Sequence, residues 1–275
     1  MAFRHSILTL IICVCAGTQA FSKQPPLLST PPLPAGTAFV IGTYSEHEAA
    51  ASHMIRPLNA SNSILYEQQF GGGGLGLGLL MGPLGVAANI AAIKKRTEAE
   101  SQALFGKVGI DPVALLASLL EEAAIPRASE TSATTFTMKP HVHLVSEGNE
   151  NAWLGAGIDV SDSSKPWTGK YLVQVAGDWP RSELASGLSP DRAREFEEQV
   201  KTALRAALHL YIDDAAAKLN GTDKVNFTAL FMTPRIKIPL YGMVLPSDDA
   251  HQVFRSIGGI FSFPAGQAEV TKHLK

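Results

Sequence analysis

The sequence predicts an α+β fold in which an antiparallel sheet packs against one long amphipathic helix. Between residues 136 and 179, three segments alternate apolar and polar residues and are separated by turn-forming residues, as antiparallel strands are. After them, Ser189 and Pro190 provide a helix start, and apolar residues then recur every three or four positions until Gly221. Strands followed by a helix with one apolar face are typical of α+β domains, so we expect residues 136–275 to form one.

Composition limits the classes of function. The chain has 275 residues, of which 45% are hydrophobic and 17% charged, so it is long enough for a substantial core. Its formal net charge is −2, and the longest basic run is Lys94, Lys95 and Arg96. A nucleic-acid partner would need a basic excess, so we expect none.

The first twenty residues have the form of a secretory signal peptide. A basic start at Arg4 precedes an apolar run over residues 7–16, and small residues lead to a cleavage position after Ala20. The run is too short to span a bilayer. We therefore expect residues 1–20 to direct export; the alternative is a short buried amino-terminal helix.

Both cysteines, Cys13 and Cys15, lie within this signal. A mature chain without them has no disulfide, no thiolate nucleophile and no zinc–thiolate site. Lipid attachment at one of them is the alternative. However, the preceding residues, Ile12 and Val14, are bulky where lipoprotein signals have small residues.

A proline-rich tether is expected next, over residues 21–36. Five prolines lie between Pro25 and Pro34, a density that favours an extended chain. Residues 37–45 are rich in β-branched and aromatic residues and predict a first strand. This strand opens a region, residues 37–125, that also contains the longest apolar run of the chain.

That run is a glycine-rich segment, residues 71–93, with no charged residue. As a helix it would be about 34 Å long, enough for a hydrocarbon core of about 30 Å. Gly74, Gly78 and Gly82 recur every four residues, with Gly85 near the same side, and such a small-residue face lets a second helix approach closely. The segment resembles the glycine-zipper segments of bacterial envelope proteins. The resemblance implies membrane contact, association with an envelope protein, or a homo-oligomer.

Pro83 departs from the zipper pattern, because it kinks a helix or begins a new one. Three other interpretations therefore stay open. Residues 75–79 alternate as a strand or loop would, and a helix from Pro83 onward could lie in a soluble core. The third is a phosphate-binding loop at Gly71, Gly73 and Gly76.

Two helices follow in the sequence. Residues 97–108 predict a solvated helix broken at Gly106 and Gly109, and Asp111 with Pro112 starts another that is apolar almost all round and so must be buried. Residues 126–135 are polar and predict a linker. Beyond the long helix, strands are expected at residues 225–232, 235–245, 258–264 and 267–273, and the stretch from Ser247 to Asp249 is expected to cap a short helix before Gly258.

One constellation could hold a divalent metal. His141 and His143 share one face of a predicted strand whose other face is apolar. Glu147 has the same parity as the histidines, and Asp159 follows on the next strand as a further ligand. The competing interpretation is a solvent-facing strand whose polar residues are histidines. The adjacent carboxylates of Asp213 and Asp214 point in different directions on a helix, so we do not expect them to share a proton.

Established enzyme motifs are missing from the sequence, including the G-x-S-x-G elbow, H-E-x-x-H and the G-x-x-x-x-G-K phosphate loop. The sequence thus favours a non-enzymatic protein of a bacterial envelope, in the periplasm or at a membrane, with a glycine-zipper segment and a binding or assembly domain. One alternative is a periplasmic metal-dependent hydrolase that uses His141 and His143. Another is a secreted membrane-active protein.

Overall fold

The computed structural model describes residues 26–31, 37–49, 55–68, 82–128, 136–147, 150–162, 167–221, 223–232 and 238–274. The predicted signal peptide lies outside these residues, and only residues 26–31 of the predicted tether lie within them.

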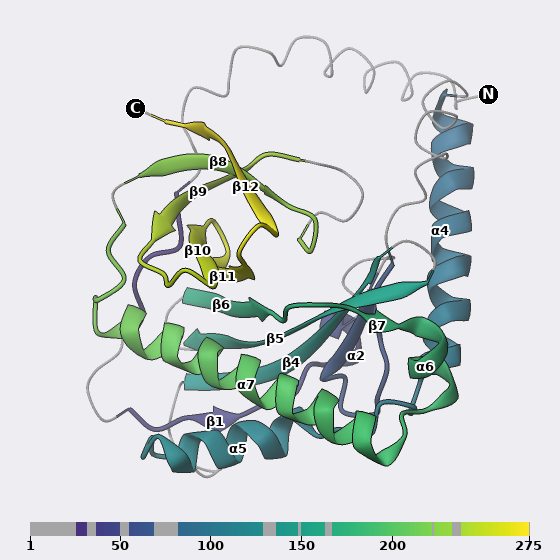
Figure 1. The fold of residues 1–275 in the computed structure, drawn as a ribbon, viewed down its shortest axis with the longest axis horizontal. Coiled ribbons are helices and arrows are strands. Elements are labelled where there is room, and N and C mark those ends of the chain that lie inside the picture. Colours follow the sequence, from purple (N-terminus) through teal and green to yellow (C-terminus); the bar gives the residue numbers. More distant parts are fainter. Residues whose placement is uncertain are drawn as a thin grey trace, which may run out of the picture.

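The described strands form one mixed sheet, and helices accompany it (Figure 1). The fold is therefore of mixed α and β content. The main path of the sheet runs β12-β8-β9-β10-β11-β6-β5-β4-β3-β2, with β1 beside β4 and β7 beside β5. The strands are β1 (Val40–Ile41), β2 (Ile55–Pro57), β3 (Ile64–Glu67), β4 (Phe136–Glu147), β5 (Asn151–Asp162), β6 (Trp167–Gln174), β7 (Trp179–Pro180), β8 (Lys224–Ala229), β9 (Leu240–Leu245), β10 (His251–Ser256), β11 (Gly259–Pro264) and β12 (Ala268–His273).

The pairing of the strands is only partly antiparallel. β4, β5 and β6 form the predicted antiparallel meander. In contrast, β1 and β3 run parallel to β4, and β11 runs parallel to β6, so the expectation of an antiparallel sheet was wrong for these pairs. Alternation along a strand reveals which face is buried but carries no information about a neighbour distant in the sequence.

The helices are α2 (Glu46–Ala49), α4 (Gly82–Leu104), α5 (Pro112–Glu122), α6 (Arg181–Ser186) and α7 (Pro190–Ala215). Asp111 caps α5 and Ser189 caps α7, each with proline in the first turn, as predicted. α7 ends at Ala215 rather than at Gly221, because Ala217 takes the left-handed conformation (φ 54°) that ends the helix.

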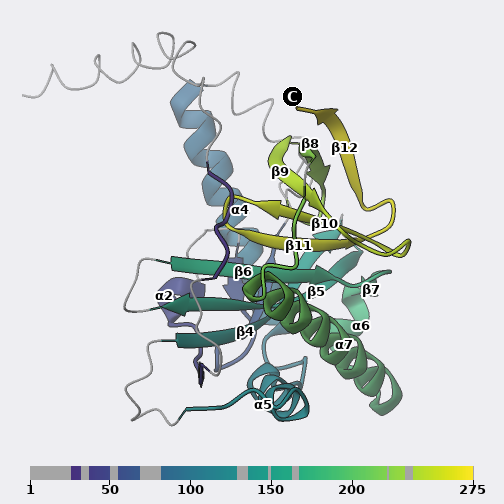
Figure 2. The same ribbon diagram turned by 90° about the vertical axis from the view of Figure 1, so that its left-hand side faces the viewer.

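Two hydrophobic clusters lie on opposite faces of the central strands. α5 and α7 cover one face and bury Met138, Val142 and Leu144 of β4 beneath them (Figure 2). On the other face, Val145 of β4 joins a second cluster from the carboxy-terminal strands. Its aromatic centre includes Phe227 stacked on Phe254, with ring centroids 4.2 Å apart.

Two local predictions require correction. The helix expected after Ser247 is instead strand β10, which pairs with β9 on one side and β11 on the other. Asp248 does accept a backbone hydrogen bond, from Ala250 N at 3.0 Å, but the chain turns there and continues as a strand. The first strand is also shorter than residues 37–45, because only Val40–Ile41 pair with β4.

A buried ionic network joins α7 to strands β6 and β10. Asp214, near the end of α7, accepts a hydrogen bond from Tyr171 on β6 at 2.8 Å and another from the guanidinium of Arg255 on β10. Arg255 also donates to the carbonyl oxygens of Leu28 and Leu219, each at 3.2 Å. The partners satisfy both charges in the interior, as buried ions require.

We expect Arg255→Met to lower the free energy of unfolding by about 3–5 kcal/mol, because Asp214 would stay buried without its counter-charge. Urea denaturation of purified protein measures this. Adding Asp214→Leu should restore part of the loss. The control is Lys218→Met, which breaks an exposed ion pair with Asp213 and should cost less than about 1 kcal/mol. Equal losses in the two single variants would contradict the assigned role.

Candidate functional site

His141 and His143 share one face of β4, as the sequence predicted, but that face is not solvent-exposed. His141 is fully buried and the side chain of His143 is 12% exposed. The competing interpretation, a solvent-facing polar strand, is therefore wrong. Both rings lie on the face opposite α5 and α7.

Glycines on the neighbouring strand make room for His141 and for Phe231, which packs against His143. In the β4–β5 register, His141 faces Gly157 and His143 faces Gly155. A Cβ atom at Gly157 would lie 2.3 Å from the carbonyl oxygen of Tyr171 and 3.2 Å from His141 Cε1. One at Gly155 would lie 2.5 Å from Phe231, whose ring packs edge-on against His143. The backbone therefore excludes a larger residue at Gly157, whereas a larger residue at Gly155 would have to displace the Phe231 ring.

Burial keeps His141 neutral. Its Nδ1 shares a hydrogen bond of 3.0 Å with the hydroxyl of Tyr44, and the nearest carboxylate oxygen, of Asp159, lies 3.8 Å away. Burial lowers the pKa of His141 to about 3, and the nearby charge of Lys170 acts in the same direction, while that of Asp159 opposes it. Burial also raises the pKa of Tyr44, as does Asp159.

Glu67 is the member of this cluster that the sequence did not indicate. Its Oε2 lies 3.1 Å from His143 Nε2. β3 brings it there by pairing in parallel with β4, so that Glu67 stands beside Val145, on the same face as His143. The signal that could have revealed it was this parallel pairing, which strand periodicity does not give.

The described residues form two neighbouring pairs. His141 lies near Asp159, and His143 lies near Glu67. His141 Nε2 has no hydrogen-bond partner, so it is the ring nitrogen that could bind a ligand. Within the described part of the chain, no three His, Cys, Asp or Glu side chains converge as a metal site. The metal site at His141, His143 and Asp159 stays a prediction.

The second set of predicted residues lies on the glycine-rich segment. Gly74 and Gly78 fall outside the described residues, whereas Gly82 begins α4 and Gly85 lies in its first turn. α4 is continuous to Leu104, so the helix expected over residues 97–108 and the last part of the glycine-rich segment are one element. Among the helices described, none is both long and apolar enough to cross a membrane.

Glu100 fixes the carboxy-terminal half of α4 to the body. It accepts hydrogen bonds from Tyr66 on β3 at 2.5 Å and from Arg96 at 2.8 Å, and it pairs with Arg181 of α6 at 3.0 Å. Burial opposes ionisation of Glu100, but these donors together outweigh it and hold its pKa below the usual value. A second ion pair, Arg56 to Glu98 at 3.4 Å, ties the helix to β2.

Known proteins give no further guide to this cluster. No protein-family model matches the chain, and searches of curated proteins and of solved structures find no match.

Because its pKa is lower in the folded chain, His141 should make stability pH-dependent. The unfolded chain, with an ordinary histidine pKa of about 6.5, binds this proton more readily below that pH. His141 therefore contributes stability above about pH 6.5, and that contribution is lost as the pH falls toward 3, by at most about 1.4 kcal/mol per pH unit.

Urea unfolding between about pH 6 and pH 4 tests this prediction. We expect His141→Phe to flatten the dependence of the unfolding free energy on pH. His209→Phe, at an exposed position on α7, should leave the slope unchanged. The same slope in wild type and His141→Phe would show that His141 binds its proton equally well in both states.

Proposed function

We propose that this chain is a non-enzymatic component of a bacterial envelope, exported by residues 1–20. In this proposal the glycine-rich segment attaches the protein to a membrane, to a helix of an envelope partner, or to a second copy. The α+β body then supplies a binding or assembly surface in the periplasm.

The observation that carries the proposal is the way α4 leaves the body. Thr97, Ser101 and Leu104 are buried, whereas Ala91 and Ala92 are exposed. The amino-terminal part of α4 extends beyond the sheet in both views (Figures 1 and 2). A helix fixed by Glu98 and Glu100 at one end supports the glycine-rich segment as an attachment arm.

Sequence chemistry supports the same role for this arm. Small residues at Gly74, Gly78, Gly82 and Gly85 would let a partner helix approach its backbone, an arrangement that favours helix association where water is scarce. Lys94 and Lys95 are exposed and directly follow the apolar part of α4 in the sequence. If that part enters a membrane, these lysines would meet the lipid headgroups.

Fractionation of cells that express the full chain tests the attachment. We expect it in the membrane pellet after sodium carbonate extraction. Leu79→Asp with Leu80→Asp should release it into the soluble fraction, because a buried carboxylate is costly in hydrocarbon. Phe105→Asp, at an exposed residue beyond α4, is the control and should leave the protein in the pellet.

A triple variant separates the two modes of attachment. Gly74→Leu, Gly78→Leu and Gly82→Leu remove the small-residue face but keep the segment apolar. If helix association holds the protein, cross-linked pairs should disappear in this variant; if the bilayer holds it, the variant should stay in the pellet. A wild-type chain that is soluble after export would overturn the proposal.

The unpartnered Nε2 of His141, on the same face as His143, keeps a second candidate function open, a periplasmic metal-dependent hydrolase. That function predicts stoichiometric zinc in purified protein, lost in His143→Ala and kept in His209→Ala. Elemental analysis measures both. Metal-free wild type, purified without chelators from zinc-supplied cells, would remove this candidate.

A further inference from the structure

Residues 26–31 form an amino-terminal strap that lies against the sheet without being one of its strands. The strap has neither helix nor strand, yet it is hydrogen-bonded to both β6 and β10. Figure 2 shows it in dark purple, running past the ends of these strands. This part of the proline-rich sequence is therefore bound to the body of the protein.

Two side chains, three residues apart, anchor the strap. Leu28 is 8% exposed and belongs to the core that α7 covers, and Pro31 is also buried, whereas the two residues between them are exposed. A polyproline II chain has three residues per turn, so this spacing places both anchors on one side. Gly169 of β6 makes room for the first anchor, because a Cβ atom there would lie 3.3 Å from Leu28 Cδ2 and 2.8 Å from Trp167 Cη2.

The body holds the strap by its backbone atoms. The amide of Leu28 donates to the carbonyl oxygen of Ser256 at 2.8 Å, and the carbonyl oxygen of Leu28 accepts from Arg255 at 3.2 Å. The indole N–H of Trp167 donates to the carbonyl oxygen of Ser29 at 3.1 Å. An aromatic side chain against a proline-rich segment is a recurring way in which proteins bind peptides. The surface under the strap therefore has the form of a site for a Leu-x-x-Pro peptide.

Release of the strap leaves the polar groups of the body with partners. Arg255 keeps two other acceptors, the carboxylate of Asp214 and the carbonyl oxygen of Leu219. The acceptor of the Trp167 indole lies on the strap itself, so water takes its place when the strap leaves. The main loss is the exposure of one leucine and one proline, a small part of the buried apolar surface. The strap therefore opens locally while the body stays folded.

A second copy of the chain carries the same ligand. Its strap offers the same anchors and backbone atoms, so an exchange between two copies rebuilds every contact of the closed chain. Residues 32–36, which include two prolines, are the whole connection between the strap and Thr37. A short connection favours exchange, because folding back within one chain strains it.

We propose that the surface under the strap is an exchangeable peptide-binding site, which a second copy of this chain fills with its own residues 26–31. Each copy then binds Leu28 and Pro31 of the other. Every contact named above lies outside residues 71–93, so the inference does not depend on the membrane attachment proposed for that segment.

The peptide PPLLSTPPLP, which has the sequence of residues 25–34, tests the site directly. The receptor variant is the full chain with Leu28→Ser and Pro31→Ser, which removes both anchors of its own strap, and circular dichroism checks that it is folded. Fluorescence polarisation of the labelled peptide measures binding. We expect the peptide to bind the receptor variant, and to bind the unmodified chain about tenfold more weakly or less, because the chain's own strap competes.

Matched substitutions test both sides of the contact. In the peptide, Leu28→Ala should weaken binding about tenfold, because most of the buried leucine surface is lost, whereas Thr30→Ala, at an exposed position, should not. In the receptor variant, Trp167→Phe should weaken binding by removing the indole donor. Trp179→Phe is its control, because the indole of Trp179 donates to Gln199 instead.

Mixing two full-chain variants tests exchange between copies. The receptor variant supplies an intact site, and Gly169→Val supplies an intact strap but fills the space of its own Leu28. We expect hetero-pairs in the mixture by native mass spectrometry, and none when the strap donor also carries Leu28→Ser. Association through the glycine-rich segment would give the same pairs in both mixtures, so the two proposals fail separately.

Hydrogen exchange of the unmodified chain needs no variant, and it decides the case in which the receptor variant does not fold. The amide of Leu28 should exchange far faster than that of Ala156 in the central strand β5, because only the strap has to open. The proposal is overturned if Leu28 exchanges as slowly as Ala156, if the peptide does not bind the folded receptor variant, or if no hetero-pairs form in the first mixture.

Discussion

The fold depends on one buried pair of opposite charges, Asp214 and Arg255. Among the described strands, the first half of the sheet (β1 to β7) pairs with the second half (β8 to β12) through β6 and β11, which run parallel. α7 packs on β5 and β6 of the first half, whereas Arg255 lies on β10 of the second. Tyr171 completes the network from β6 itself. A carboxylate and a guanidinium without water each require the other, so the pair fixes the position of the second half relative to α7. The hydrophobic clusters on the two faces can then form around this fixed arrangement of α7 and the second half of the sheet.

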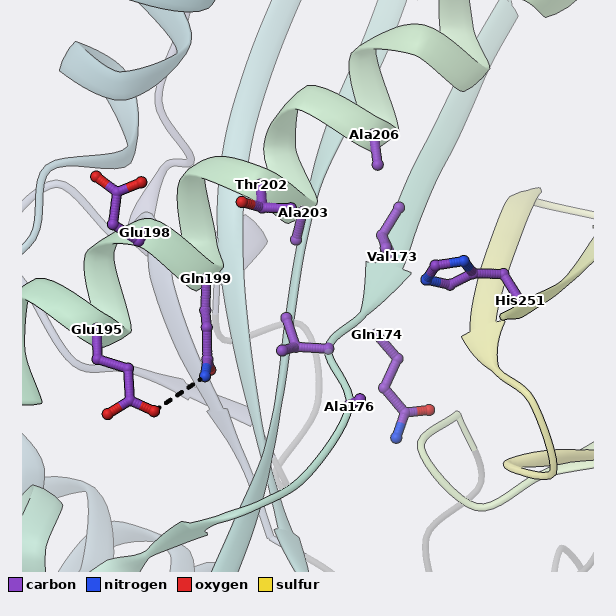
Figure 3. Close-up of a pocket in the computed structure, with 11 residues that line it drawn as sticks. Val173, Gln174, Ala176, Glu195, Glu198, Gln199, Thr202, Ala203, Ala206 and His251 are labelled. Atoms are coloured by element: carbon purple, nitrogen blue, oxygen red, sulfur yellow. Dashed lines mark hydrogen bonds between the residues drawn. The ribbon is translucent and has the colours of Figure 1, made fainter. Parts of the chain in front are cut away.

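The same packing leaves two regions with different chemistry. Gly157 leaves space for the imidazole of His141, and Gly155 leaves space for Phe231 beside His143; burial then keeps His141 neutral. Along α7, in contrast, the small apolar side chains of Ala203 and Ala206 face Val173 of β6 across a cavity of about 420 Å³ (Figure 3). A buried neutral histidine suits a structural or tightly enclosed role.

The sequence predicted those features that depend on residues close together in the chain, such as helix caps and the faces of a strand. Ser189 and Asp111 were identified as caps because their side chains act on backbone groups two or three residues away. The shared face of His141 and His143 followed from the period of a strand. The sequence did not reveal Glu67 beside His143 or the strand at His251–Ser256, because each depends on pairing between distant segments.

The carbonyl oxygen of Leu28 lies near the start of the chain, yet its hydrogen-bond donor, Arg255, is 227 positions further along. During synthesis from the amino terminus, the segment around Leu28 therefore cannot form this hydrogen bond until nearly the whole chain has been made. Because the loop between Leu28 and Arg255 spans most of the chain, this contact raises the mean sequence separation of contacting residues, a property that slows folding.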